Sequence, residues 1–254
     1  MALAEDANTH TPLRPGQDRV TRDLYVVFFG ERSDHPAFTV VQRLRLGEDD
    51  VEETVAELRT LLRDRGRLPC TWEIGTHATP AGLTDQLFGL GLEPFDEPFA
   101  VGMVLDEEPP AGPPEIVVRR VSTAEEMAAA HRIARISFGH DDPDAVSLEE
   151  AARDLERERL EDSWASFLAF VDGEPVAQAQ ATFTAHGAVM NGGSTLPEAR
   201  GRGAYRALVR ARWDEARRRG TPSLITQAGG MSRPILERLG FREVCQIQIL
   251  LDRG

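Results

Sequence analysis

Cysteine is scarce in this 254-residue chain, which contains only Cys70 and Cys245. The two residues lie far apart in the sequence, and neither belongs to a Cys-x-x-Cys motif or to a Cys/His ligand spacing. The sequence therefore predicts neither a disulfide scaffold nor a zinc site. We expect two reduced, buried thiols and no bound metal.

Long hydrophobic runs and positive charge are also in short supply. No stretch is long and apolar enough to predict a membrane span, and the first twenty residues lack the apolar run of a secretory signal. We therefore expect a cytoplasmic protein with no membrane partner. The 29 basic residues are outnumbered by 42 acidic residues, which gives a formal net charge of −13. Such a chain repels a polyphosphate backbone, so we expect no nucleic-acid partner.

The composition is otherwise that of a folded protein, with 41% hydrophobic and 28% charged residues. Residues 1–20 are polar and lack a periodic apolar face, which predicts a disordered tail. Four of the nine residues 106–114 are prolines, which sustain neither a helix nor a sheet ladder. We therefore predict a first domain over residues 21–106, a linker over 107–114 and a second domain over 115–254.

Hydrophobic periodicity predicts that both domains mix helices with strands. In the first domain we expect strands over residues 24–29, 38–46, 70–74 and 99–105 and helices over residues 51–62 and 84–90. In the second domain we expect strands over residues 116–121, 167–171, 175–184, 188–196, 224–226 and 241–251, with helices beginning near residue 122 and over residues 145–160, 201–219 and 234–239. The fold class is therefore α/β, in the broad sense that includes α+β.

A glycine-rich turn joins a predicted strand to the longest predicted helix. Its sequence, at residues 196–206, is Leu-Pro-Glu-Ala-Arg-Gly-Arg-Gly-Ala-Tyr-Arg. Backbone N–H groups at the start of a helix have no partners within the helix, and the helix dipole adds about half a positive charge there. Gly201 and Gly203 would let the backbone approach a phosphate closely. The pattern therefore predicts an anion-binding site.

Other interpretations of this turn stay open, because Arg-Gly-Arg-Gly can also be a solvated loop or part of an RNA-binding tail. A P-loop would need a lysine after the second glycine, and a dinucleotide fold would need Gly-x-Gly-x-x-Gly with a later acidic residue. Neither pattern is present. The placement of the turn between a strand and a helix favours phosphate binding.

The turn resembles the acyl-CoA motif of the GNAT superfamily of N-acetyltransferases, which is usually described as Q/R-x-x-G-x-G/A. Arg200 and Gly203 match its first two anchors, whereas the third falls on Tyr205. Residues 234–241, Pro-Ile-Leu-Glu-Arg-Leu-Gly-Phe, resemble the closing helix and Gly-Phe turn of the family. The resemblance covers residues 116–252 and implies a mixed, mostly antiparallel central sheet flanked by helices.

The resemblance also implies a binding site for acetyl-CoA as cosubstrate. The backbone of Ser194, Thr195 and Leu196 would run along the pantetheine arm like an added strand. The amides of the loop would hold the pyrophosphate, and Ser232 could touch the pantetheine. The implied loop residues are Arg200, Gly201, Arg202, Gly203, Ala204, Tyr205 and Arg206. The three arginines could instead be solvated surface residues, since peptide N–H groups can bind phosphate without them.

The first half of the chain looks like a degenerate copy of the same fold, with residues 80–94 similar to a segment of tandem GNAT proteins. It contains no Arg-Gly-x-Gly loop. We therefore hypothesise two GNAT-like halves, of which only the second binds acetyl-CoA.

The catalytic groups are much less well marked than the cofactor loop. Family members often use a tyrosine in the last helix as general acid, but the corresponding residue here is Leu236. The resemblance implies a bend of the central strand near Asn191 or Gly192, where a backbone N–H could stabilise an oxyanion. His140 and Glu73 are weak candidates for a general base, against the alternative that both are ordinary polar surface residues.

The polar residues Gln178, Gln180 and Thr182 share one face of their strand. They could line an acceptor pocket or simply face solvent. The sequence does not decide between these two interpretations.

These observations lead to one main hypothesis and two alternatives. The main one is an acyltransferase that moves the acetyl group of acetyl-CoA to the amine of a small molecule by direct attack in a ternary complex. The alternatives are a non-catalytic acyl-CoA-binding sensor or scaffold and an RNA-binding module. A homodimer is one option for the assembly, and the sequence does not identify the acceptor.

Overall fold

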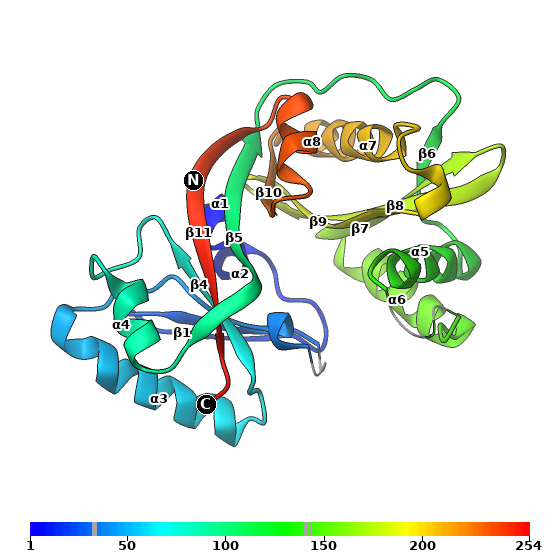
Figure 1. Ribbon diagram of the computed structural model, residues 1–254. Coiled ribbons are helices and arrows are strands. Elements are labelled where there is room, and N and C mark those ends of the chain that lie inside the picture. Colours follow the sequence, from blue (N-terminus) through cyan, green and yellow to red (C-terminus); the bar gives the residue numbers. More distant parts are fainter. Residues whose placement is uncertain (32–34, 140–141, 143) are drawn as a thin grey trace. The chain divides into compact units, whose positions relative to one another are not determined.

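The computed structural model describes residues 1–31, 35–139, 142 and 144–254 (Figure 1). The chain forms two compact units. The first contains residues 1–103, 227–235 and 243–254, and the second contains residues 104–226 and 236–242. The units are therefore not two consecutive stretches of chain, because the C-terminal strand belongs almost entirely to the first. The linker predicted at residues 107–114 stays a prediction.

The first unit contains a sheet with the strand order β1-β2-β3-β4-β11-β5. These strands are β1 (Asp18–Thr21), β2 (Val26–Phe29), β3 (Thr39–Gln42), β4 (Cys70–Gly75), β5 (Glu93–Leu105) and β11 (Arg242–Asp252). Strands β3 and β4 are parallel, whereas β1–β2, β2–β3 and β4–β11 are antiparallel. The parallel pair is connected by α3 (Val51–Asp64). Helix α4 (Leu83–Gly89) connects β4 to β5, and the short 3₁₀ helices η1 (Pro36–Phe38) and η2 (Glu48–Asp50) flank β3.

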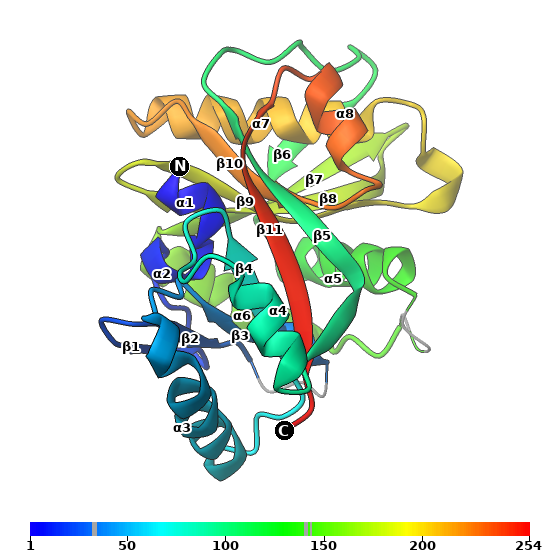
Figure 2. The ribbon, with the colours of Figure 1, turned by 60° about the vertical axis from the view of Figure 1, so that its left-hand side comes forward.

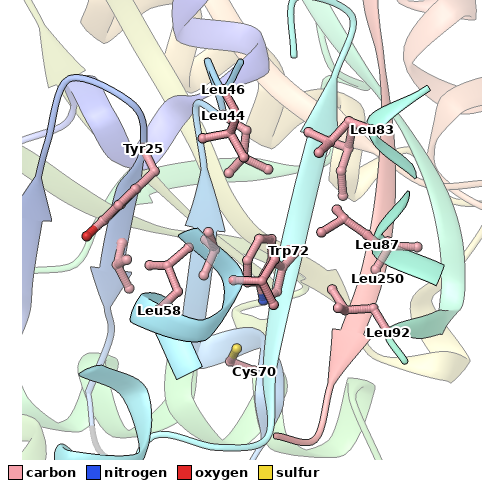
Figure 3. Packing of buried hydrophobic residues seen from close by; sticks show 14 of the residues in the cluster. Tyr25, Leu44, Leu46, Leu58, Cys70, Trp72, Leu83, Leu87, Leu92 and Leu250 are labelled. Carbon is pink, nitrogen blue, oxygen red and sulfur yellow. The ribbon is translucent and has the colours of Figure 1, made fainter. Parts of the chain in front are cut away.

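The core of the first unit lies between α3, α4 and one face of this sheet (Figure 3). Val51, Val55, Leu58 and Leu62 recur at helical spacing and are buried, which explains why the sequence pattern identified α3 correctly. The fully buried Trp72 of β4 belongs to the same cluster.

The start of the chain does not form the disordered tail that we expected. It forms two single-turn helices, α1 (Ala2–Glu5) and α2 (Ala7–His10). Leu3, Ala4, Glu5 and Asp6 are buried. The Glu5 carboxylate accepts a hydrogen bond from the His77 amide at 2.8 Å. Helices this short show no periodic apolar face, so the sequence pattern could not reveal them.

The second unit contains the strand order β10-β9-β8-β7-β6. Its strands are β6 (Val117–Arg120), β7 (Trp164–Val171), β8 (Glu174–Thr184), β9 (Gly187–Thr195) and β10 (Leu224–Ala228), the last of which ends in the first unit. Strands β9 and β10 are parallel, and the other pairs are antiparallel. The predicted mixed, mostly antiparallel sheet is confirmed.

Helices cover both faces of this second sheet. Helix α7 (Ala204–Arg218) lies on one face, and α5 (Ala124–Ser137) and α6 (Leu148–Glu161) lie on the other (Figures 1 and 2). Helix α8 (Arg233–Arg238) follows β10 along the chain. No helix within the described residues is long and apolar enough to cross a membrane.

The helices of the second unit begin in two different ways. Thr123 caps α5 by accepting a hydrogen bond from the Glu126 amide, and Ser147 forms a capping box with Glu150 at the start of α6. Helix α7 instead begins after Gly203, which supplies no side-chain cap. The first turn of α7 therefore presents its N–H groups without the partner that the other two helices possess.

Candidate functional site

Strand β9 is bulged in its second half. It pairs in register with β8 from Gly187 to Asn191, and the register then shifts so that Gly192 and Gly193 lie opposite a single residue. Gly192 has a φ of +49°, a left-handed conformation that glycine adopts at low cost. A bulge leaves one residue outside the ladder and bends its strand, so it can redirect backbone N–H groups.

Polar side chains of β8 support the bulge. Gln178 Nε2 donates to the carbonyl of Gly192 and, at 2.9 Å, to Ser194 Oγ. Thr182 Oγ1 donates to Asn191 Oδ1 at 3.0 Å. Two members of the predicted polar face therefore bind the neighbouring strand. Their support of β9 was missed at the sequence level, because it depends on the register.

The other edge of β9, where the bulge begins, has no strand partner in the part of the second unit that the structure describes. The parallel ladder with β10 consists of Ala188 and Val189, paired with Leu224 and Ile225. Beyond Val189, no ladder partner lies on this edge among the described residues of the second unit. An open strand edge is the feature to which an extended ligand can add by backbone hydrogen bonds. Ser194, Thr195 and Leu196, the predicted pantetheine contacts, follow along this segment.

The glycine-rich turn continues directly from this edge. The 3₁₀ helix η3 (Pro197–Ala199) leads to Arg200, and Gly201 and Gly203 take φ values of +76° and +89°. The first turn of α7, which starts at Ala204, contains no acidic residue. The structure therefore places an uncapped helix start after two left-handed glycines, an arrangement that suits a phosphate.

The arginines of the turn extend into solvent. Arg200, Arg202 and Arg206 are exposed, and Arg200 Nε donates to the Thr195 carbonyl at 3.4 Å. In the part of the chain that the structure describes, Arg202 and Arg206 have no acidic partner within ion-pair distance. Their charges are thus free to interact with an anion at the start of α7.

Tyr205, which occupies the third anchor of the motif, packs against β9. A Cβ atom added to Gly193 would lie 2.9 Å from Cε2 of the Tyr205 ring. The ring therefore fills the space beside the bulged strand. The ring can come this close to β9 because residue 193 is glycine; a larger residue there would displace the ring.

The remaining predicted residues are only partly accounted for. Asn191 is half-buried and bonded to Thr182, as described above. His140 lies outside the described residues. Ser232 and Glu73 belong to the first unit, where Ser232 Oγ donates to the Gly229 carbonyl at 3.4 Å. Leu236 is buried, so the position of the family's tyrosine holds a core residue.

The carboxyl group of Glu73 has a raised pKa. Burial raises the pKa of its carboxyl to about 7, and the hydrogen bond from Gln227 at 3.2 Å offsets only part of this effect. A carboxyl group with such a pKa is partly ionised near neutral pH, which suits a general base. The same shift also arises in structural carboxyl groups, so the role of Glu73 stays a prediction.

No metal cluster is formed by the side chains that the structure describes, in the sense of three or more His, Cys, Asp or Glu residues able to share an ion. Cys70 and Cys245 are free and buried. Their predicted burial is confirmed.

Comparison with known proteins agrees with the geometry of the second unit. Residues 124–241 match the family model described as the acetyltransferase (GNAT) family. No curated protein matches the sequence.

Solved structures share the fold of nearly the whole chain. A GCN5-related N-acetyltransferase from Kribbella flavida is 20% identical with a TM-score of 0.68, and the alignment covers 94% of this chain and 90% of that one. A tandem GNAT protein from the clavulanic acid biosynthesis pathway is 15% identical with a TM-score of 0.66, with 94% and 84% of the two chains covered. A GCN5-related N-acetyltransferase from Sphaerobacter thermophilus is 18% identical with a TM-score of 0.64, with 93% and 75% covered.

The family match covers most of the second unit, so this unit is similar to GNAT acetyltransferase domains. The resemblance predicted from the glycine-rich turn is confirmed.

Proposed function

We propose that this protein transfers an acetyl group from acetyl-CoA to the amine of a small molecule, by direct attack within a ternary complex. One observation carries the proposal: the open edge of β9 leads, through η3 and the two left-handed glycines, to an uncapped, acid-free helix start. These two features suit the two chemically different parts of acetyl-CoA. An extended amide chain pairs with a strand edge, and a pyrophosphate binds helix N–H groups.

The residues of the second unit have distinct tasks in this proposal. The backbone of Ser194, Thr195 and Leu196 binds the pantetheine arm. The amides of Gly201, Arg202, Gly203, Ala204, Tyr205 and Arg206 bind the pyrophosphate. Arg200, Arg202 and Arg206 add positive charge in a chain whose net charge is −13. Ser232 is a further proposed contact of the cosubstrate.

The chemistry requires a neutral amine, a donor to the developing oxyanion and a proton for the leaving thiolate. The nitrogen lone pair attacks the thioester carbonyl and forms a tetrahedral intermediate. Collapse of this intermediate breaks the carbon–sulfur bond and releases CoA. A backbone N–H at the bulge near Asn191 is the proposed oxyanion donor. Because the side chain of Leu236 has no acidic proton to donate, we propose that water protonates the thiolate.

Glu73 and His140 are the proposed candidates for the base. Replacing Glu73 by glutamine removes the ionisable group and keeps the size of the side chain and its ability to bond Gln227. If Glu73 is the base, the variant will lose kcat and retain its affinity for acetyl-CoA. An unchanged pH–rate profile in the variant would remove Glu73 from the mechanism.

The experiment that tests the proposed function is a thiol-release assay with acetyl-CoA and a panel of small amines, with anionic amino compounds included as a comparison group. The acidic chain favours cationic acceptors. The chain contains no lysine, so acetylation of its own lysine side chains cannot contribute to the signal. Amine-dependent thiol release with an acetylated product supports the proposal. Tight acetyl-CoA binding without turnover on any amine would contradict it.

The second candidate is a non-catalytic acyl-CoA-binding sensor or scaffold. The observation that favours it is the buried Leu236 at the position where family members often carry a tyrosine. Both candidates require the loop to bind acetyl-CoA, and turnover distinguishes them. The cytoplasmic location and a homodimeric assembly stay predictions.

A further inference from the structure

Arg212 is a buried cation that the proposed function does not use. It lies in the middle of α7, and only 1% of its surface is exposed. Its Nε donates to the Leu208 carbonyl at 3.1 Å, and its Nη1 donates to the Gln180 carbonyl at 3.4 Å. Its Nη2 is buried and has no hydrogen-bond partner among the described residues. Burial of a charged group with so few partners is costly, so its presence needs a reason.

Tyr205 is the side chain that connects Arg212 to the proposed cosubstrate site. The guanidinium carbon of Arg212 lies 5.8 Å from the centroid of the Tyr205 ring, within the range of a cation–π contact. Burial lowers the pKa of Arg212, and the interaction with Tyr205 opposes that change. The buried guanidinium and the half-buried ring are therefore coupled electrostatically.

The Tyr205 ring also lies against the bulge. Gly193 approaches the ring so closely that an added Cβ would lie 2.9 Å from Cε2. Gly193 and Gly192 are the two residues that form the bulge in β9. Arg212, Tyr205 and Gly193 thus form one line of contacts from the middle of α7 to the strand proposed to hold the pantetheine arm.

We propose that Arg212 is a positioning residue that acts through Tyr205 to hold the bulge of β9 in the shape that acetyl-CoA requires. The inference rests on the proposed function and deepens it. It also explains the departure from the family motif, since Tyr205 stands where glycine or alanine is expected. A glycine at 205 would leave Arg212 without its aromatic neighbour and would leave the space beside Gly193 unfilled.

The first test measures the shape of β9 without any ligand. Hydrogen exchange is compared in wild type, Arg212→Met and Tyr205→Phe, with Arg218→Met as the matched control at the exposed end of the same helix. We expect peptides covering residues 188–196 to exchange about tenfold faster in Arg212→Met, with a smaller change in Tyr205→Phe. The control should match wild type. Equal exchange of this segment in Arg212→Met and wild type would overturn the proposal.

The second test asks whether the effect reaches the cosubstrate. Calorimetry compares acetyl-CoA with 3′-phosphoadenosine 5′-diphosphate, the CoA fragment that lacks the pantetheine arm. Arg212→Met should weaken acetyl-CoA binding about tenfold and leave binding of the fragment unchanged. Arg212→Lys, which keeps the charge, should recover part of the loss. A tenfold loss for both ligands would show a general structural defect and refute a positioning role.

A third test does not depend on the folding of Arg212→Met. Gly193→Ala should disturb β9 in wild type, where the ring blocks the new methyl group, and should be tolerated in Tyr205→Ala. Additive effects of the two substitutions would contradict the line of contacts. If Arg212→Met speeds up exchange of residues 188–196 as expected but wild type binds no acetyl-CoA, the proposed function fails and the link between Arg212 and the bulge stands.

Discussion

The segments β3-α3-β4 and β9-α7-β10 share a topology and differ in the turn that precedes the helix. Each contains two parallel strands joined by a helix, next to an antiparallel neighbour. In the second unit the turn contains two left-handed glycines with Arg200 and Arg202, and Arg206 follows in the first turn of α7. In the first unit the turn ends in Glu48, Asp49 and Asp50, and Glu52 and Glu53 occupy the first turn of α3.

This difference shows that the shared topology alone does not create an anion-binding helix start. The carboxylates at the start of α3 satisfy the positive end of its dipole and repel an added phosphate. Helix α7 has no such group and leaves its N–H donors open. In the proposed function, the charge and conformation of a few turn residues therefore decide which of the two similar segments binds acetyl-CoA.

The largest expected effect concerns the core of the first unit. Trp72→Ala removes a fully buried ring from the cluster around α3 and should lower the free energy of unfolding by about 4 kcal/mol. Chemical denaturation measures the loss, with Leu160→Ala as the control because Leu160 is 76% exposed. A loss below about 1 kcal/mol would show that the first unit does not depend on this core.

The next effect would break the contrast between the two turns. Replacing Arg202 and Arg206 by glutamate gives the second turn the negative charge of the first. We expect acetyl-CoA affinity to fall about 100-fold, since a charged hydrogen bond contributes about 1.5–3 kcal/mol. Calorimetry measures the change. The control replaces Arg153 and Arg157 of α6 by glutamate, and an equal loss in that control would mean that only the overall charge matters.

The third effect is a pH dependence of the stability of the first unit, which we expect from Glu73. The folded pKa of Glu73, about 7, is raised from its ordinary value of 4.5, so the unfolded chain ionises first as the pH rises. Stability from this group is therefore full below pH 4.5 and is lost as the pH rises to about 7. Glu73→Gln should be more stable than wild type by about 2 kcal/mol at pH 8. This is less than the full pKa shift would give, because the side chain is partly exposed. At pH 4 we expect no difference in stability between the two proteins. Thermal unfolding at both pH values measures this difference, and wild type gaining stability relative to the variant above pH 7 would refute it.

The smallest effect compares a capped helix start with the open one. Ser147→Ala removes the side-chain acceptor for the Glu150 amide at the start of α6 and should cost about 1 kcal/mol. Urea denaturation measures the loss. The conservative Ser147→Thr should restore most of the stability, and a neutral Ser147→Ala would mean that α6 does not depend on its cap.

The sequence predicted the elements whose local patterns are strong. The apolar spacing of α3 and the glycine-rich turn before α7 depend on residues that are close in the chain. The resemblance implied a bend of β9 near Asn191 or Gly192, but local patterns could not predict the bulge itself, because it exists only in the pairing of β8 with β9, where the register shifts between Gln178 and Gln180. The short helices α1 and α2 were missed because their buried carboxylates, Glu5 and Asp6, look like surface residues in the sequence.

Arg212 illustrates the same limit for the candidate site. In the sequence it is one of many arginines on an amphipathic helix, and arginine is usually exposed. Only the packing of α7 on the sheet shows that it is buried beside Tyr205.

The glycine at 203 also has a second role, because an added Cβ would meet Pro113 Cγ at 2.7 Å. Gly203→Glu would therefore strain the loop as well as add charge.

The central claim is that the chain binds one acetyl-CoA, through the turn before α7. Calorimetric titration of acetyl-CoA into wild type and into the Arg202→Glu, Arg206→Glu variant tests it most directly. We predict one equivalent per chain in wild type and an affinity about 100-fold lower in the variant. Two equivalents per chain, or undiminished binding to the variant, would contradict the claim.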